Sequence, residues 1–508
     1  MTISSLSIDS IDSLKSKLAN ELFAAVQHKQ WATLLDTCKN QLSDGRYDII
    51  VYKPAATYQF KSGRSVLDIY SDSAKVLEKQ NLSHSPFDDL SKLHQVFSAQ
   101  FDCQSQQNSS LPYLIGALGL FGYDINTHTD HIHDAAPDQY QLADIAIGFY
   151  DQSLIFDNYT GEVFHVHANA SSANAKSVSD WLAPFLAFDT TLTEAPQQLF
   201  YLTRDWQANM SEGEYVASMQ RISEHLHAGD CYQINFAQRF SAAYNHFEPG
   251  SEWAAYSMLR KVNKAPFSSF MRVGESCVLS LSPERFISVK NGQVVTKPIK
   301  GTRKRAKNAE QDRYLAQQLL DSEKDKAENL MIVDLLRNDL SKHCQPHSVK
   351  VPHLFALESY PAVHHMVSTV VGTLKSKASP FDLLAGAFPG GSITGAPKVR
   401  AMQIIQDLEP DKRSIYCGSI GYVGIRNDMD TNICIRTILA EKGMMHCWAG
   451  GGIVLDSQAQ DEYQESFDKV AKILPILSKT LAPDSKSICN NNRVEQESID
   501  HGKSEKAK

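Results

Sequence analysis

The chain has 508 residues, a formal net charge of −8 at pH 7, and 42% hydrophobic and 21% charged residues. This balance is ordinary for a soluble globular protein, and the mild acidity argues against a sequence-independent nucleic-acid binder, which would carry a strong basic excess. No run of about 18 apolar residues suggests a membrane span, and nine cysteines without a Cys-x-x-Cys pair favour reduced thiols in a cytoplasmic protein.

Strand patterns dominate the first part of the chain. Residues 47–52 form one, and residues 154–156 and 163–166 flank a turn signal at 158–161, which is typical of a hairpin. Residues 116–122 are small and apolar, which suits close backbone packing. A connector pattern at residues 186–200 ends this region, so we place a first part at residues 1–195.

Helices and strands alternate irregularly after the connector. Residues 211–228 predict a helix in which Ser211 and Glu214 form a capping box and Gly229 ends the helix. Further helices are predicted at 323–336 and 461–474, and strands at 233–239, 278–281, 294–296 and 418–423. An antiparallel-rich α+β fold fits this order better than regular βαβ units. We assign the catalytic region to residues 196–480 and expect the polar tail, residues 481–508, to be disordered.

A lysine and a glutamate lie close together in the sequence, in a setting that suits chemistry. Lys300 lies in a Pro-Ile-Lys-Gly-Thr segment, sixteen residues after Glu284 in a Ser-Pro-Glu-Arg-Phe segment. A lysine that loses its proton in a pocket is a nucleophile, and a nearby carboxyl is its proton-transfer partner. Taken alone, Lys300 is more simply a surface lysine, because four basic residues follow it closely.

Carboxylates on two predicted helices indicate a metal site. Glu328 precedes an apolar run, and Glu462 and Glu465 are three residues apart, on one helix face. Hard oxygen ligands from two helices suit Mg²⁺. Each glutamate by itself is more often a solvated residue of an amphipathic helix.

Glycine-rich segments and basic side chains predict contacts with an anion. Residues 388–398 form a glycine-rich turn that leads into a helix, and residues 449–452 are expected to form a second turn before a strand. The first segment lacks the lysine of a Walker A loop, so a carboxylate is a better ligand for it than a nucleotide phosphate. Arg436 can hold a carboxylate bidentately. If its segment is a strand, His365 faces a pocket and His364 points away from it.

Read together, six motifs resemble the chorismate-utilising enzymes over nearly all of residues 202–477. The motifs are residues 282–286, 298–302, 327–335, 337–339, 390–398 and 430–436. The resemblance implies a fold of two large, mostly antiparallel sheets packed as a sandwich with helices outside. Residues 31–35 and 118–124 extend the similarity into the first part of the chain.

Within that family the chain is most similar to the branch that aminates chorismate to 4-amino-4-deoxychorismate. The anthranilate synthase large subunit has alanine where Lys300 stands. Isochorismate and salicylate synthases have a water-activating lysine at the position that matches Gln233, and an amide cannot serve as that base.

The resemblance implies a role for each candidate residue. Lys300 attacks ring carbon C2 and Glu284 protonates the departing C4 hydroxyl. His365 is a supporting catalytic residue. The remaining roles are Mg²⁺ binding by Glu328, Glu465 and Glu462, and substrate binding by Arg436, Gly452, Ile453, Thr394 and Lys398, with Arg436, Gly452 and Ile453 at a carboxylate.

Ammonia has to come from a partner, because the chain has no Gly-x-Cys-x-Gly glutaminase elbow. The resemblance implies a separate glutamine amidotransferase subunit. Two alternatives stay open: an anthranilate synthase large subunit, and a catalytically idle protein that only stabilises an amidotransferase.

One segment departs from the anthranilate synthases. Their Leu-Leu-Glu-Ser segment takes part in tryptophan binding, and the nearest segment here is Leu-Leu-Asp-Thr at residues 34–37. Regulation by tryptophan therefore does not follow, although a buried amino-acid pocket could persist.

Overall fold

The computed structural model describes most of the chain. It covers residues 3–39, 45–70, 76–82, 85–102, 109–130, 132–133, 136–168, 175–189, 199–360 and 363–482. Most of the predicted connector and nearly all of the predicted tail, residues 481–508, lie outside these described residues.

The first of two large sheets has twelve strands, and its neighbours pair antiparallel. In spatial order the strands are β1 (Leu6–Ser10), β10 (Val163–Ala168), β9 (Gln152–Asp157), β3 (Tyr47–Val51), β2 (Thr33–Asp36), β13 (Phe267–Val273), β14 (Ser276–Ser282), β23 (Thr437–Glu441), β24 (Met444–Ile453), β12 (Gln233–Tyr244) and β11 (Leu202–Ala208). The short strand β20 (Gly395–Ala396) adds to β12 beside β24.

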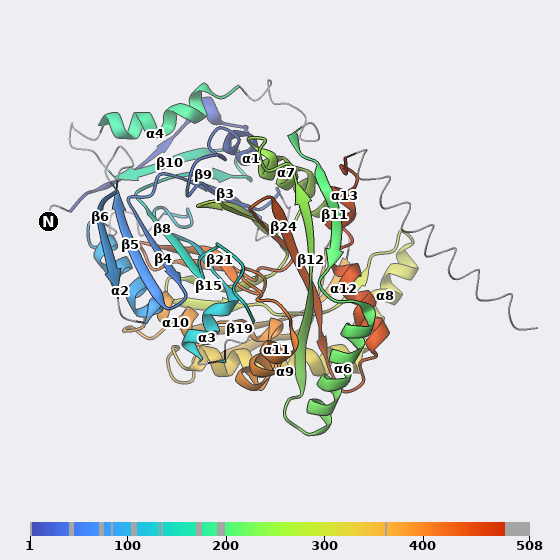
Figure 1. The fold of residues 1–508 in the computed structure, drawn as a ribbon. Helices are drawn as coiled ribbons and strands as arrows, with labels where there is room; N and C mark the ends of the chain where they lie inside the picture. Colours follow the sequence, from blue (N-terminus) through green and yellow to red (C-terminus); the bar gives the residue numbers. More distant parts are fainter. Residues whose placement is uncertain are drawn as a thin grey trace, which may run out of the picture.

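The second sheet also has twelve antiparallel strands. Its order is β17 (Ile299–Lys304), β19 (Val363–Thr373), β16 (Gln293–Thr296), β15 (Arg285–Lys290), β22 (Met429–Asn432), β21 (Ser419–Gly424), β7 (Gly116–Phe121), β8 (Ile145–Tyr150), β4 (Ala56–Lys61), β5 (Arg64–Tyr70) and β6 (Val76–Leu82), with β18 (Lys350–Ser359) on β19. Both sheets combine strands from before and after the connector, so the two parts of the chain share one architecture (Figure 1).

The main core lies between the sheets. It joins apolar side chains of the first sheet, such as Val278 and Trp448, with those of the second, such as Leu120 and Ile147. Each Å² of apolar surface that this core removes from water stabilises the fold by about 25 cal/mol. The predicted sandwich of two antiparallel sheets is confirmed.

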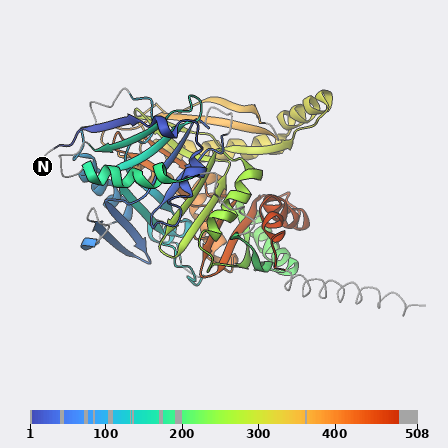
Figure 2. The ribbon, with the colours of Figure 1, turned by 90° about the horizontal axis from the view of Figure 1, so that it is seen from above.

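Helices cover the outer faces of the sheets, as Figures 1 and 2 show. Three of them pack on β12 and β24: α6 (Glu212–His227), α11 (Lys398–Leu408) and α12 (Ala459–Val470). A second cluster on the first sheet involves α1 (Ala19–Phe23), α4 (Ala175–Ala187), α7 (Ser251–Asn263) and α13 (Leu474–Ser478). The helices α2 (Pro86–Ser98), α8 (Ala309–Asp321), α9 (Glu323–Ser341) and α10 (Pro380–Ala387) lie on the side of the second sheet, and the short α3 (Asn126–Thr129) follows β7.

Most of the predicted elements are confirmed, and two details are wrong. Helix α6 has the expected capping box, and Gly229 adopts a positive φ of 76° just after it. Residues 449–452, which were predicted to form a turn, are instead part of strand β24. This strand lies so close to its neighbour that a Cβ on Gly450 would come within 2.0 Å of the Phe236 carbonyl oxygen. These glycines permit close strand pairing, a use of glycine that a turn prediction overlooks. The last predicted helix ends at Val470, and Pro475 lies in the first turn of a separate helix, α13.

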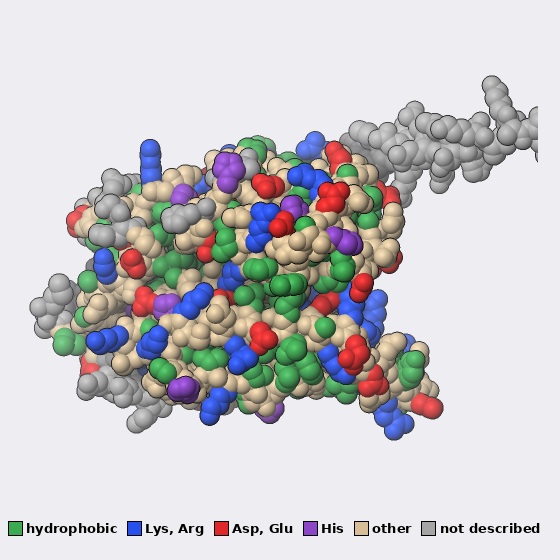
Figure 3. Space-filling model, turned by 90° about the horizontal axis from the view of Figure 1, so that it is seen from below, with side chains coloured by type: hydrophobic (Ala, Val, Ile, Leu, Met, Phe, Trp, Pro, Cys, Tyr) green, Lys and Arg blue, Asp and Glu red, His purple; other side chains and the backbone are tan. Residues whose placement is uncertain are grey.

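No helix among the described residues is long and apolar enough to cross a membrane. On the face shown in Figure 3, acidic and basic side chains are interspersed.

Candidate active site

Strand β17 presents Lys300 beside a bulge. The register of β17 against β19 shifts between Lys300 and Thr302, and Gly301 between them has φ of 77°. A Cβ on Gly301 would lie 2.7 Å from Leu319 Cδ1 and 2.9 Å from the Asp325 carboxylate, so this position favours glycine. Bulges re-aim side chains, and the Lys-Gly pair in the sequence encodes this one.

Burial perturbs both Lys300 and Glu284. Glu284 lies between β14 and β15 and is 8% exposed. Burial raises the pKa of Glu284 to about 6, although the Lys300 ammonium opposes this rise. Burial also lowers the pKa of Lys300, while Glu284 and Glu328 oppose the change. Both shifts favour the uncharged forms, which a nucleophilic amine and a general acid require.

Ser392 connects the two groups. The Lys300 Nζ donates to the Ser392 carbonyl oxygen at 3.2 Å, and the Ser392 hydroxyl donates to Glu284 Oε1 at 3.3 Å. Ser392 belongs to the short 3₁₀ turn Gly391–Ile393, inside the predicted glycine-rich segment. Sequence reasoning selected this segment for its glycines and missed the serine, although the serine lies within the same motif.

Arg436 is a cation near Lys300 and Glu284 whose side chain forms no ion pair among the described residues. Its guanidinium has no hydrogen-bond or ion-pair partner among the described residues, and its backbone has φ of 54°. Burial lowers the pKa of Arg436 while Glu284 opposes the change, yet its side chain reaches solvent. The Arg436 side chain is exposed, and its charge acts on Glu284. Such a guanidinium is ready to receive a carboxylate.

His365 and His364 point to opposite faces of their strand. Both lie on β19; His364 Nε2 contacts Asp312 of α8 at 3.1 Å, whereas the Nδ1 of His365 shares a hydrogen bond of 2.8 Å with the Thr302 hydroxyl. Burial, followed by the charge of Arg436, lowers the pKa of His365 to about 4, so its imidazole is neutral at pH 7. The predicted strand alternation is confirmed.

Three glutamates approach the lysine from two helices. Glu328 lies on α9, and Glu462 and Glu465 lie on α12. Burial raises the pKa of both Glu328 and Glu462, and Glu465 adds to each rise. Both Glu328 and Glu465 also act on the pKa of Lys300. The carboxylates therefore belong to the same electrostatic neighbourhood as the lysine.

Ammonium groups neutralise part of this acidic charge. Lys469 lies 2.6 Å from Glu465 Oε1, and Lys324 lies 3.9 Å from Glu328. Among the described residues no three His, Cys, Asp or Glu side chains lie close enough to hold a metal ion. The donor types still fit Mg²⁺, because all three are hard carboxylate oxygens and their mutual repulsion favours a cation.

Strand β24 brings Gly452 and Ile453 to the predicted substrate side. They pair with Asn235 and Ile234 of β12. The Gln233 amide packs against Gly452, where a Cβ would lie 2.5 Å from Gln233 Nε2. Both polar atoms of the Gln233 amide are buried without a hydrogen-bond partner. A buried unpaired amide is costly, so this position calls for a polar ligand.

Two predicted contact residues have other partners. Lys398 forms a 2.6 Å ion pair with Asp339 and donates to the Ala387 carbonyl, and it contacts none of the residues around Lys300. Thr394 is fully buried, and its hydroxyl donates to the Gly390 carbonyl at 3.1 Å. The structure therefore does not place the Lys398 ammonium with the other predicted substrate-binding groups.

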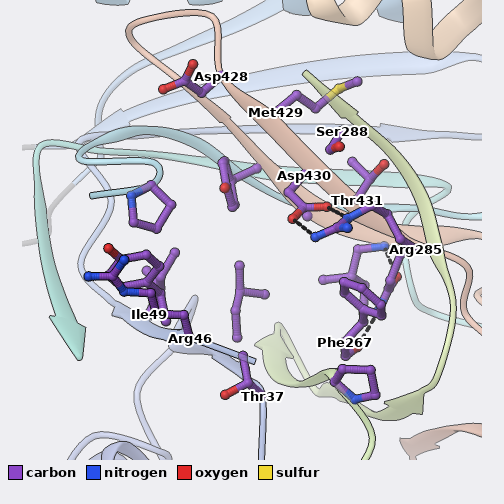
Figure 4. A pocket seen from close by; sticks show the side chains of 18 of the residues that line it. Thr37, Arg46, Ile49, Phe267, Arg285, Ser288, Asp428, Met429, Asp430 and Thr431 are labelled. Atoms are coloured by element: carbon purple, nitrogen blue, oxygen red, sulfur yellow. Dashed lines mark hydrogen bonds and ion pairs between the residues drawn. The ribbon is translucent and has the colours of Figure 1, made fainter. Parts of the chain in front are cut away.

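A separate cavity of about 490 Å³ lies between the two sheets. Its lining includes Arg46, Arg285, Asp430 and the segment of residues 35–37 singled out in the sequence (Figure 4). We call it the inter-sheet cavity. Lys300 and Glu284 do not line it. Several of its charges are paired: Arg285 contacts Asp430 at 2.8 Å, and the Asp36 carboxylate accepts from Arg260 and Tyr256.

The fold and this site together define an enzyme with a half-buried lysine, a protonatable glutamate and an exposed arginine that has no side-chain partner among the described residues. The family model for chorismate binding enzymes matches residues 53–475. The chain belongs to this family.

Relatives and solved structures agree with this assignment. The chain is 45% identical over 456 residues to aminodeoxychorismate synthase component 1 of Klebsiella aerogenes, covering 90% of this chain and 96% of the relative. The component 1 protein of Escherichia coli K12 is 44% identical, with coverage of 90% and 95%. Anthranilate synthase component I of Streptococcus pneumoniae TIGR4 superposes with a TM-score of 0.71 at 30% identity, over 84% of this chain and 92% of the other.

Proposed function

We propose that this chain aminates chorismate at C4 to give 4-amino-4-deoxychorismate, for p-aminobenzoate and folate synthesis. The observation that carries the proposal is Lys300, a half-buried lysine with a lowered pKa that shares Ser392 with Glu284 as a hydrogen-bond partner. Similarity of 44–45% over 90% of the chain to aminodeoxychorismate synthase component 1 supports it.

Lys300 and Glu284 carry the first displacement. The neutral Lys300 amine bonds to ring carbon C2, both ring double bonds shift by one position, and the C4 hydroxyl leaves as water with the proton of Glu284. Lys300 is then a secondary ammonium on the ring, and Glu284 is a carboxylate. Burial keeps a proton available on Glu284, whose pKa is raised to about 6. The reaction therefore proceeds by two displacements through a covalent intermediate, and not by one direct displacement of a poor leaving group.

Ammonia completes the reaction. It bonds to C4, both double bonds return to their original positions, and the Lys300 nitrogen leaves C2 with its bonding electrons as a neutral amine. The Glu284 carboxylate takes the extra proton of the new C4 ammonium and is restored to its acid form. The enolpyruvyl group stays on the ring throughout. Gln233 cannot act as a base toward water, because an amide has no basic lone pair near neutral pH, and this disfavours hydroxylation at C2.

The substrate carboxylates need two positive partners. Arg436, which has no partner among the described residues, holds one of them, and the backbone near Gly452 and Ile453 supports it. Mg²⁺, held by Glu328, Glu465 and Glu462, would neutralise the other carboxylate. The neutral His365 contributes a contact rather than charge, and Thr394 supports the glycine-rich segment by donating to the Gly390 carbonyl.

We further propose that a glutamine amidotransferase subunit supplies the ammonia. The name "component 1" of the relatives supports such a partner. Purified chain with chorismate and ammonium salts should then turn over without the partner, whereas glutamine should support turnover only when the partner is added.

Mass spectrometry of the product is the decisive experiment. Chorismate, ammonium and Mg²⁺ should give an aminated ring that retains its enolpyruvyl group. Anthranilate formation is the alternative, and it is less supported, because the anthranilate synthase relatives match at only 31% and 34% identity. Fluorescent anthranilate with loss of pyruvate would establish that alternative and overturn the proposal.

A further inference from the structure

Ser392 contacts both reacting groups through two different atoms. Its carbonyl oxygen accepts from Lys300 Nζ at 3.2 Å, and its hydroxyl donates to Glu284 Oε1 at 3.3 Å. No other described residue forms hydrogen bonds with both side chains. The separation of the lysine and the glutamate therefore depends on where Ser392 lies.

The turn that carries Ser392 is held on both sides by packed residues. A Cβ on Gly391 would lie 2.3 Å from Leu335 Cδ2 of α9, and one on Gly390 would lie 2.8 Å from Ile433 Cδ1. Close packing of this kind leaves little freedom for the turn.

A buried cation fixes the next residue of the turn. Arg413 is 1% exposed and donates to the Ile393 carbonyl at 3.1 Å and to the Asn235 carbonyl of β12. Glu409 pairs with this guanidinium, and Arg413 lies 4.6 Å from the Tyr123 ring centre. The turn is therefore tied to the first sheet, while Lys300 belongs to the second.

We propose that Ser392 is a positioning residue that orients the Lys300 amine and the Glu284 carboxyl toward the substrate, an inference that rests on the proposed function. One N–H of the amine is directed to the Ser392 carbonyl, so the lone pair of the neutral amine points elsewhere. The serine hydroxyl occupies Oε1 of Glu284, so the transferable proton is carried on Oε2.

The protonation of the pair gives this role a measurable consequence. The reactive form has a neutral Lys300 and a protonated Glu284, so the pair holds one proton. Below the pKa of Glu284 the pair gains a second proton and turnover falls. The Ser392 hydroxyl lowers the pKa of Glu284 by donating to its carboxylate. Its removal should therefore move the acid limb of the pH profile to higher pH.

Three variants test the inference in the ammonium-dependent reaction, each with Mg²⁺ present. In Ser392→Ala we expect kcat to fall about tenfold and KM for chorismate to change less than about twofold, because orientation and not binding is lost. The acid limb should move up by about half a pH unit. Ser392→Thr, which keeps a hydroxyl, should restore the limb to its wild-type position.

Ser288→Ala is the matched control. Ser288 is a half-buried serine on β15 whose hydroxyl donates to the Val295 carbonyl at 3.4 Å. It should leave both kcat and the acid limb unchanged. A Ser392→Ala enzyme with an unmoved acid limb, whether its kcat falls or not, would overturn the inference, because a merely structural role changes kcat without moving the limb.

A titration without substrate separates this inference from the proposed function. Glutamate labelled with ¹³C at the carboxyl carbon gives a signal for Glu284 that is absent from Glu284→Gln. Its midpoint should rise in Ser392→Ala and return in Ser392→Thr, whichever product the wild-type enzyme makes. An unchanged midpoint would contradict the role of Ser392, whereas the wrong product with a shifted midpoint would contradict only the proposed function.

Discussion

The Lys300 site and the inter-sheet cavity treat charge in different ways. At the cavity, buried and half-buried charges are paired: Arg285 pairs with Asp430 at 2.8 Å, Arg46 with Asp157 at 2.7 Å, and Asp36 with Arg260. In the Lys300 site Arg436 has no partner among the described residues, and burial shifts the pKa values of Lys300 and Glu284 toward the neutral forms.

This difference identifies the reactive site better than cavity volume does. Unpaired charges and perturbed pKa values are costly to maintain, so they persist where chemistry uses them. Ion pairs at a cavity wall stabilise the structure, and their charged groups are less available for catalysis. Substitutions of single residues in each region test this difference.

The largest effect is expected from Lys300→Ala. Loss of the nucleophile should lower kcat for amination by about 10⁴-fold, in the range seen when a covalent nucleophile is removed. Lys297→Ala is the matched control, because Lys297 lies nearby and pairs with Glu358 at 3.2 Å. Near wild-type turnover of Lys300→Ala would show that ammonia attacks C4 directly.

Removal of Mg²⁺ should be nearly as severe. We expect a chelator to lower turnover by about 10³-fold or more, since metal stabilisation of charge is worth several kcal/mol, and added Mg²⁺ should restore it. Mg²⁺ should also raise the Tm of the wild type but not that of Glu328→Ala. Glu323→Ala, at an 87% exposed position of the same helix, is the control. Turnover and Tm unaffected by chelator would exclude the metal assignment.

In the inter-sheet cavity, Asp36→Ala should affect stability and leave the chemistry unchanged. The substitution leaves Arg260 without its partner, the fully buried Asp36 carboxylate. Breaking a buried ion pair lowers the free energy of unfolding by about 3–5 kcal/mol. Urea unfolding should show the loss, while kcat per folded molecule stays at the wild-type value. A large fall in kcat without a loss of stability would mean that the two regions do not differ as described.

Arg436→Gln should weaken substrate binding. Loss of a charge-assisted hydrogen bond costs about 1.5–3 kcal/mol, so KM for chorismate should rise about 10- to 100-fold with a smaller change in kcat. Arg426 pairs with Asp428 at 2.7 Å at the inter-sheet cavity, and Arg426→Gln should leave KM unchanged. Steady-state kinetics of the two variants would decide which arginine meets the substrate.

The smallest effect expected is in the pH profile of the wild type. Glu284 must be protonated and Lys300 neutral, so turnover should fall below about pH 6, where Glu284 binds its proton while Lys300 is still charged. It should fall again at high pH, when the pair loses its last proton. Glu284→Gln should lose the acid limb along with most of its activity. Persistence of that limb in Glu284→Gln would assign it to another group.

Sequence patterns were sufficient where short-range physics decides the structure. The capping box at Ser211 and the hairpin of β9 and β10 follow from local rules, and both are observed. The prediction failed at residues 449–452, where the glycines serve strand pairing across β12 and β24 instead of a turn. Lys398 was predicted to bind substrate from its place in a motif, but its partner Asp339 lies 59 residues away in the chain.

The sequence by itself determined the family, the antiparallel α+β architecture and the residue types for the chemistry, because motifs and periodicity are local properties of the chain. Only the tertiary structure decided which groups meet. Lys300 and Glu284 acquire their shifted pKa values from burial, and Ser392 reaches them from a turn that long-range contacts hold in place. Burial and contact depend on segments distant in the sequence, so no local pattern could assign them.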